Sequence, residues 1–113
     1  MGVLCDITST LICRSAESWK NLGEFRFHNL NVTDLEFSKQ GDRLLSASRD
    51  RTWALWKVVN EGGNFSLKMT ESGSFHTRAL WVGTWAPTGS FFATGGRDKK
   101  LALWAPAGDR GDR

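Results

Sequence analysis

Hydrophobic and polar residues alternate with a period of two in the middle of the chain. Between residues 32 and 38, Leu35 and Phe37 fall on one side of an extended backbone, whereas Asp34 and Glu36 fall on the other. This alternation is typical of a β-strand with one buried face. Short apolar or alternating segments at residues 43–48, 52–57, 65–70, 80–86, 90–95 and 100–104 predict further strands.

Turn-forming residues separate these segments at intervals of about eight to twelve residues. Gly41 lies in the sequence KQGD, where a turn needs a residue that can adopt positive φ, and a glycine-rich stretch occupies residues 60–64. No segment shows the periodicity of an amphipathic helix. The pattern therefore predicts an all-β fold built from antiparallel sheets.

The second half of the chain repeats the first at an offset of 48 positions. The motif SASRDRTWALWK begins at residue 46 and ATGGRDKKLALWA at residue 93, so that Asp98 stands 48 positions after Asp50. Seven of the thirty aligned positions in residues 28–57 and 76–105 are identical, which is too many for coincidence over that span. A repeat of this length is typical of propeller blades and solenoid units. Because the first period holds four predicted strands, we interpret each repeat as one blade of a β-propeller.

Each repeat carries a histidine, a hydroxyl residue, an aspartate and a tryptophan at matching positions. An indole N–H can donate to the hydroxyl, the hydroxyl to one imidazole nitrogen, and the other imidazole N–H to the carboxylate. Such a chain would satisfy every buried polar group and would fix one packing of the blade. The candidate structural residues are His28, Ser46, Asp50 and Trp56 in the first repeat and His76, Thr94, Asp98 and Trp104 in the second.

These residues carry a resemblance to the WD-repeat β-propeller family, whose blades contain a tetrad of the same four residue types. The resemblance covers about residues 18–105. Phe27 and Phe75 replace the glycine that usually precedes the histidine, and Lys57 and Ala105 replace the aspartate that usually follows the tryptophan. The implied fold is all-β, with about two four-stranded antiparallel blades and a ring that is not closed in this chain.

The resemblance also divides the chain into segments. Residues 1–17 match no part of the pattern, and residues 18–27 supply the last strand of a preceding blade. Residues 28–75 form the first blade, residues 76–105 form an incomplete second blade, and residues 106–113 form a disordered tail. Because the second blade ends before a fourth strand, we expect a fragment or a shortened product of a longer protein.

A narrower resemblance is to the WD-repeat subunit family of the Elongator complex. The segments SWKNL, FHNLNVTDLEFS, SASRDRTWALWK and GGRDKKLALW carry it, although Gly96 stands where that family usually has serine. The resemblance implies a scaffold that binds other Elongator subunits in the cytoplasm and nucleus. It would support tRNA wobble-uridine modification while another subunit performs the chemistry, with at most a weak or indirect contact with tRNA. A WD-repeat scaffold of another assembly and a direct RNA-binding surface remain as alternatives.

Basic residues accompany the two aspartates in the predicted turns, although a net charge of +3 is too small to identify a partner. By the WD-repeat resemblance, Arg49 and Arg97 face the surface on which partners bind, and the arginine fork suits such contacts. A solvated turn, or a salt bridge to the neighbouring blade, is an equal alternative. The candidate partner-binding residues are Arg49, Arg51, Arg97, Lys99, Lys100 and Trp81, with burial favoured for Trp81.

The sequence contains no motif for catalysis, cofactor binding or metal binding. Both histidines fall at the same position of the repeat, which favours a structural role. We therefore expect no enzyme, no cofactor and no small-molecule substrate. The spacing of Cys5 and Cys13 fits neither a zinc site nor a redox pair and favours a reducing compartment. No apolar run is long enough to span a membrane, and no membrane contact is expected.

Overall fold

The computed structural model describes residues 3–7, 10–15, 21–61 and 64–106. These residues form ten β-strands, and none of them forms a helix that could cross a membrane. The strands are β1 (Val3–Ile7), β2 (Thr10–Ser15), β3 (Asn21–Arg26), β4 (Val32–Phe37), β5 (Arg43–Ser48), β6 (Trp53–Glu61), β7 (Asn64–Gly73), β8 (Leu80–Trp85), β9 (Phe92–Gly96) and β10 (Leu101–Trp104).

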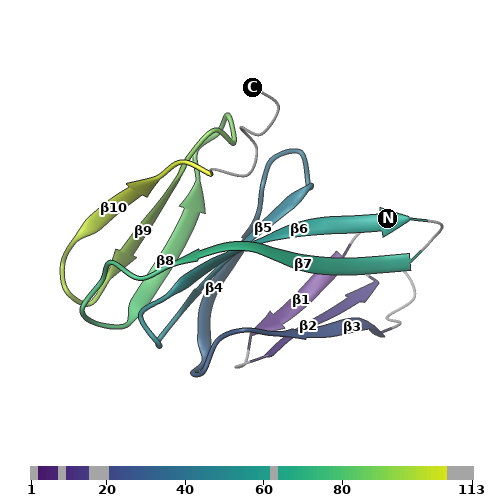
Figure 1. Ribbon diagram of the computed structural model, residues 1–113, viewed down its shortest axis with the longest axis horizontal. Helices are drawn as coiled ribbons and strands as arrows, with labels where there is room; N and C mark the ends of the chain where they lie inside the picture. The colour runs from purple at the N-terminus through teal and green to yellow at the C-terminus, as the bar shows by residue number, and fades with distance from the viewer. Residues whose placement is uncertain (1–2, 8–9, 16–20, 62–63, 107–113) are drawn as a thin grey trace.

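The strands pair into three antiparallel sheets. The N-terminal sheet has the order β1-β2-β3, the central sheet β4-β5-β6-β7 and the C-terminal sheet β10-β9-β8. Figure 1 shows the central sheet between the other two, and the described residues do not close into a ring. The predicted all-β class, with antiparallel blades in an open arrangement, is confirmed.

The N-terminal sheet differs most from the sequence-based expectation. The sequence pattern assigns no element to residues 1–17, whereas the structure places β1 and β2 there and pairs β2 with β3. The two strands are short and carry no copy of the four polar residues that mark the repeats, so the repeat could not reveal them. At the other end, the description stops at Pro106, and the rest of the tail predicted at residues 106–113 lies outside it.

Cys13 is buried and takes part in a disulfide bond. In the β1–β2 pairing it lies directly opposite Cys5. Opposite positions of antiparallel strands bring two Cα atoms within the distance that a disulfide can span. The sequence-based interpretation of two cysteines without a disulfide framework is therefore wrong, because their neighbourhood arises only from the register of the β1–β2 hairpin.

The central sheet is buried on both faces, because its inner strands carry apolar residues at successive positions. On β5, Leu44 packs in the cluster toward the N-terminal sheet and Leu45 in the cluster toward the C-terminal sheet. The first cluster contains Leu11, Cys13, Val32, Leu44, Ala54, Trp56, Phe65 and Leu67, and the second contains Leu45, Ala47, Trp53, Leu55, Leu80, Trp85 and Phe92. Removal of this apolar surface from water is the main force that stacks the sheets.

Two carboxylates on β4 join the central sheet to β8. Asp34 accepts the backbone N–H of Gly83 at 3.0 Å. Glu36 accepts the backbone N–H of Trp85 at 2.6 Å, and its own carbonyl accepts the Trp85 indole N–H at 3.0 Å. A Cβ on Gly83 would lie 3.0 Å from the Leu45 side chain, so a larger residue there would require that side chain to move. The two sheets are therefore held by directed hydrogen bonds as well as by apolar packing.

Candidate functional site

Four predicted structural residues of the first repeat come together within the central sheet. The Trp56 indole N–H donates to Ser46 Oγ at 2.9 Å, and Ser46 Oγ lies 2.7 Å from His28 Nε2. The other imidazole nitrogen, Nδ1, lies 3.3 Å from Asp50 Oδ2. The Ser46 hydroxyl can therefore donate to Nε2 while Nδ1–H donates to the carboxylate. We call His28, Ser46, Asp50 and Trp56 the first network.

A fifth residue, Thr52, joins the first network. Its backbone N–H donates to Asp50 Oδ1 at 3.0 Å, and its hydroxyl donates to the same oxygen. The Thr52 hydroxyl also lies 3.1 Å from His28 Nδ1. Sequence reasoning missed Thr52, although an aspartate that bonds the backbone two residues onward is a known turn arrangement.

The second network, formed by His76, Thr94, Asp98 and Trp104, has the same connections. The Trp104 indole N–H donates to Thr94 Oγ1 at 2.9 Å, and Thr94 Oγ1 lies 2.9 Å from His76 Nε2. His76 Nδ1 lies 3.0 Å from both oxygens of Asp98. At the position that matches Thr52, Lys100 contributes only its backbone N–H to Asp98, at 3.1 Å. Because other protein groups lie within hydrogen-bonding distance of both ring nitrogens of each histidine, the arrangement suits a role in stabilising the fold.

The electrostatics of the first network favour a neutral imidazole beside an ionised carboxylate. Burial lowers the pKa of His28 below its ordinary value, and the attraction of Asp50 opposes this only in part. Burial acts to raise the pKa of Asp50, but hydrogen bonds from Thr52 and Asn29 outweigh it, and the pKa is lowered overall. The pKa of Asp98 is likewise lowered: burial would raise it, but hydrogen bonds led by that of His76 prevail.

The predicted basic residues lie next to these networks, in the β5–β6 and β9–β10 turns. The side chains of Arg49 and Arg97 are exposed, while their backbone N–H groups donate to Asn31 O at 3.0 Å and Ala79 O at 2.9 Å. The turns are thus anchored and the guanidinium groups face solvent. The exposed basic residues in these turns and in the β7–β8 connection, which we call the cationic turn surface, are Arg49, Arg51, Arg78, Arg97, Lys99 and Lys100.

The cationic turn surface has few compensating acids. Its turns and the adjoining connections (residues 27–31, 48–52, 74–79 and 96–100) contain Asp50 and Asp98 as their acidic residues, and both are bonded to histidines. Figure 1 shows the β7–β8 connection and the β9–β10 turn at the same end of the C-terminal sheet, at the lower left. The Thr33 hydroxyl bonds Leu80 O at 2.8 Å, which holds the starts of β4 and β8 together. These turns therefore form one positively charged end.

Two residues of this surface hold an unusual backbone conformation. Arg51 has a φ of 76° and Lys99, its counterpart in the second repeat, a φ of 65°. This left-handed region favours glycine and disfavours residues with a Cβ. A basic residue nevertheless occupies it in both repeats. An unfavourable backbone conformation that recurs at equivalent positions indicates a role for the basic side chains themselves.

Arg78 belongs to the surface but was not among the predicted residues. It lines a depression of about 410 Å³ together with Thr77, Arg97, Asp98 and Lys99. The position that matches Arg78 in the first repeat is Leu30, so comparison of the repeats gave no signal. Only the fold of the β7–β8 connection brings Arg78 beside Arg97.

Trp81 contradicts the favoured expectation of burial, because 62% of its surface is exposed. It lies where the β8–β9 pairing shifts register between Leu80 and Val82, and such an irregularity re-aims side chains. The Lys100 ammonium group lies 5.6 Å from the ring centre of Phe75, which in turn packs edge-on against His76. Lys100 thus contacts the ring that replaces the glycine usual in WD repeats.

No group of three or more histidine, cysteine, aspartate or glutamate side chains within the described residues could hold a metal ion. What the arrangement can do chemically is present exposed guanidinium and ammonium groups to an anionic partner. Such groups suit contacts with carboxylates and phosphates.

Comparison with known proteins agrees with this geometry. The family model described as "WD domain, G-beta repeat" matches residues 19–57 and 69–105. Among curated relatives named "Elongator complex protein 2", that of Danio rerio is 37% identical over 105 residues, which cover 88% of this chain. That of Mus musculus is 38% identical over 85% of the chain, and that of Saccharomyces cerevisiae is 42% identical over 80%.

The chain spans only 12–13% of the length of these relatives. Each family match begins near or within the last strand of one sheet, β3 or β7, and extends into the third strand of the next, β6 or β10, so that it includes both polar networks. The matched segments make up more than half of the sequence, and the chain belongs to the WD-repeat family.

Proposed function

We propose that this chain is a protein-interaction segment of an Elongator subunit, and that the cationic turn surface binds another subunit of the complex. The similarity to relatives named Elongator complex protein 2 supports the choice of complex. The proposed contribution to tRNA wobble-uridine modification is indirect and non-catalytic, and takes place in the cytoplasm and nucleus. No small-molecule substrate is part of the proposal.

One observation carries the choice of surface. Arg49 and Arg97 are exposed in turns whose backbone is anchored, while the adjacent carboxylates bond to buried histidines. The two carboxylates keep their negative charge but are outnumbered by the six basic residues of the surface, and the arginine side chains are not needed to form the turns. Arginines held in this way are suited to an acidic patch on a partner, where charge complementarity speeds association and selects the partner.

Charge reversal of the two arginines tests the proposal. Arg49→Glu combined with Arg97→Glu should leave the melting temperature nearly unchanged, since both side chains are exposed, but should reduce co-purification of the other Elongator subunits from cells. Lys57→Glu combined with Lys68→Glu is the matched control, because it makes the same change of charge at exposed positions of β6 and β7. Equal recovery of subunits with both double variants would exclude the cationic turn surface as the binding site.

Direct RNA binding is a second candidate, favoured by the depression that Arg78, Arg97 and Lys99 line. Several cations around one hollow can contact successive phosphates. Such binding would weaken steeply with salt, because each phosphate contact releases a counterion. Titration of a fluorescent single-stranded RNA at several salt concentrations separates the candidates. If RNA affinity falls steeply with salt and the slope becomes shallower with Arg97→Glu, the result supports RNA binding. If no RNA binds, the result supports a protein partner.

A further inference from the structure

The depression of about 410 Å³ within the cationic turn surface, which we call the cationic depression, carries a net positive charge. Each of the described residues that line it is polar: Thr77, Arg78, Arg97, Asp98 and Lys99. Three of them are cations and one is a carboxylate, which leaves a net charge of +2. The lowered pKa of Asp98 keeps that carboxylate ionised at neutral pH. Positive charge is therefore concentrated at one small place on the surface.

The three cations of the depression are open to a ligand. Arg78, Arg97 and Lys99 are exposed, and within the described part of the chain none of their side chains has an ion pair or a hydrogen bond. Asp98 does not pair with them, because its carboxylate accepts from His76 and from backbone N–H groups. These three positive charges are therefore available to an anion.

Hydrogen bonds fix the backbone on both sides of Arg78. The Thr77 N–H donates to Asp98 Oδ2 at 3.1 Å, and the Ala79 carbonyl accepts the Arg97 N–H at 2.9 Å. The β7–β8 connection is thereby joined to the β9–β10 turn directly before and directly after Arg78. Cations on an anchored backbone lose less freedom when they bind an anion, so the entropy cost of binding is smaller.

The first repeat has the same two backbone bonds, but Leu30 occupies the place of the arginine. The Asn29 N–H donates to Asp50 Oδ2 at 2.9 Å, and the Arg49 N–H donates to Asn31 O at 3.0 Å. The Leu30 side chain between them is 53% exposed. An arginine is thus not needed to fold this connection, and its presence in the second repeat points to a function of that repeat.

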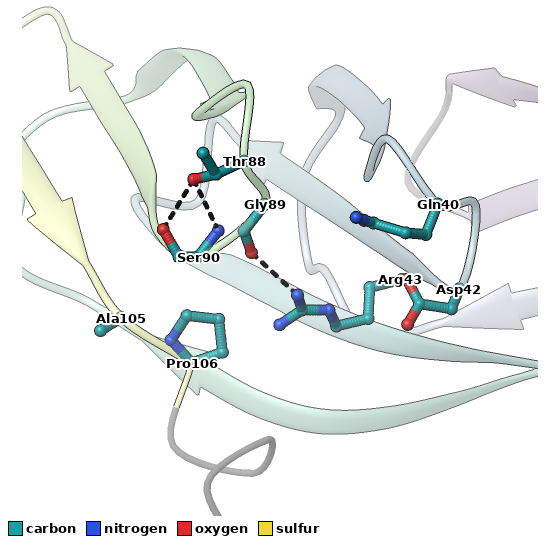
Figure 2. A pocket seen from close by; sticks show the side chains of 8 residues that line it. All are labelled: Gln40, Asp42, Arg43, Thr88, Gly89, Ser90, Ala105 and Pro106. Carbon is teal, nitrogen blue, oxygen red and sulfur yellow. Dashed lines mark hydrogen bonds between the residues drawn. The ribbon is translucent and has the colours of Figure 1, made fainter.

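A groove at the opposite end of these sheets does not offer an open cation. It lies between the β4–β5 and β8–β9 turns and has a volume of about 450 Å³ (Figure 2). Among the described residues that line it, Arg43 is the only cation. Its Nη2 donates to Gly89 O at 2.8 Å, its guanidinium lies 4.7 Å from the ring centre of Trp85, and Asp42 lines the same groove. The cationic depression is therefore the better site for an anion.

The net charge of the cationic depression distinguishes among anionic groups. A carboxylate and an internal phosphate of a nucleic acid each carry one negative charge, whereas a phosphate monoester carries about 1.5 to 2 at pH 7. Its three acceptor oxygens suit two arginine forks and a lysine. Bases of single-stranded RNA stack on aromatic rings, and none of the described residues that line the depression is aromatic. Charge and lining therefore favour a phosphate monoester on a protein.

We propose that the cationic depression binds a phosphorylated side chain presented by a partner protein. The forks of Arg78 and Arg97 bond the phosphate oxygens, and Lys99 adds a third positive charge. This proposal rests on the proposed function, because the depression is part of the surface assigned to the partner subunit. It adds the chemical group that the partner presents there.

Peptide pools that differ at one position test the site on the full chain. Three pools of dodecapeptides carry phosphoserine, glutamate or serine at the centre and random residues elsewhere, and fluorescence anisotropy measures their apparent dissociation constants. The phosphoserine pool should bind about tenfold more tightly than the glutamate pool, the effect of an additional charged hydrogen bond. Equal binding of these two pools would overturn the proposal, because any acidic group would then suffice. Displacement of the phosphoserine pool by an equal concentration of a uridine dodecamer would also overturn it.

Two variants exchange the residues that the repeats carry at one equivalent position. Arg78→Leu copies the first repeat and should weaken phosphoserine binding about tenfold, whereas Lys68→Leu removes the same charge from an exposed position of β7 and should have no effect. Leu30→Arg places a third cation beside Arg49 and Arg51 and should raise the number of peptides bound per chain from one to two. Such a gain cannot result from unfolding. An unchanged stoichiometry, or equal losses with Arg78→Leu and Lys68→Leu, would refute the site.

Phosphatase treatment separates this proposal from the proposed function. Co-purification of the Elongator subunits is compared for the wild-type chain with and without phosphatase, and for Arg49→Glu combined with Arg97→Glu. Reduced recovery with both phosphatase and the double variant supports the proposal. If the double variant alone reduces recovery, the proposed function stands and the phosphate proposal is wrong. If neither reduces recovery, the proposed function is wrong, and the partner assigned here is wrong with it.

Discussion

The central and C-terminal sheets each contain one copy of the repeat, but they differ in whether a neighbouring sheet packs on the equivalent apolar face. In both, a tryptophan, a hydroxyl residue, a histidine and an aspartate form the same chain of hydrogen bonds. Burial differs at equivalent positions of the two repeats: Leu55 is 1% exposed, whereas Leu103 is 71% exposed. The polar network is thus encoded within each repeat, while burial of the apolar face depends on a neighbouring sheet.

The second difference concerns the carboxylates that join one sheet to the next. Asp34 and Glu36 bind backbone N–H groups of β8, but the matching positions of the C-terminal sheet are Val82 and Thr84. The uncovered face of the C-terminal sheet is therefore more apolar than its counterpart. Whatever packs on that face cannot use the same carboxylate contacts. Repeats that look alike in their networks can differ in how they join their neighbours.

The largest expected contrast is between the two leucines. Leu55→Ala should lower the free energy of unfolding by about 2–5 kcal/mol, since it leaves a cavity between two sheets. Leu103→Ala should change it by no more than about 0.5 kcal/mol, because the side chain already contacts water. Urea denaturation of both variants measures the difference. Equal losses would mean that the face around Leu103 is covered in solution.

The tryptophans of the two networks should differ less. Trp56→Phe keeps the ring but removes the indole donor to buried Ser46, with an expected loss of about 1–3 kcal/mol. Trp104→Phe should cost less, because Trp104 is only partly buried and water can replace its N–H. Thermal melts of both variants beside wild type provide the comparison. An unchanged melting temperature for Trp56→Phe would refute the structural role of the first network.

Acidification should weaken the first network. The folded pKa of His28 is below its ordinary value of 6.5, so its stabilisation is complete above pH 6.5 and is lost as the pH falls through the folded pKa. The lowered pKa values of Asp50 and Asp98 act in the same direction below their ordinary value of 3.8. Melting temperatures between pH 7.5 and 5.5 should decline in wild type and less so in His28→Gln. Parallel curves for the two proteins would contradict the assigned cause.

The smallest effect should come from the left-handed turn positions. Arg51→Gly and Lys99→Gly each relieve an unfavourable φ but add disorder to the unfolded chain, so stability should rise by no more than about 1 kcal/mol. Binding of the partner should nevertheless weaken in the double variant. Urea denaturation and the subunit co-purification assay measure the two quantities. Full binding with glycine at both positions would show that these basic side chains are not used.

The sequence predicts those parts of the molecule whose residue pattern occurs in both copies of the repeat. The strands from β4 to β10 follow from alternation and turn residues, and the two networks from the offset of 48 positions. The strands β1 and β2 carry no repeated marker and were not predicted. Arg78 and Arg43 acquire their surroundings from contacts between distant turns, and the exposure of Trp81 from a register shift. Such features depend on tertiary structure and leave no local pattern.

Hydrogen exchange of the tryptophan indole N–H groups tests the central claim, that both repeats contain the same closed network, most directly. Two-dimensional ¹H–¹⁵N NMR resolves these protons, and Trp→Phe variants assign them. The account predicts slow exchange for Trp56 and Trp104, slowest for the buried Trp56, and fast exchange for Trp81, which is 62% exposed. If Trp56 or Trp104 exchanged as fast as Trp81, the indole donors would not be engaged, and the network could not be what defines each blade.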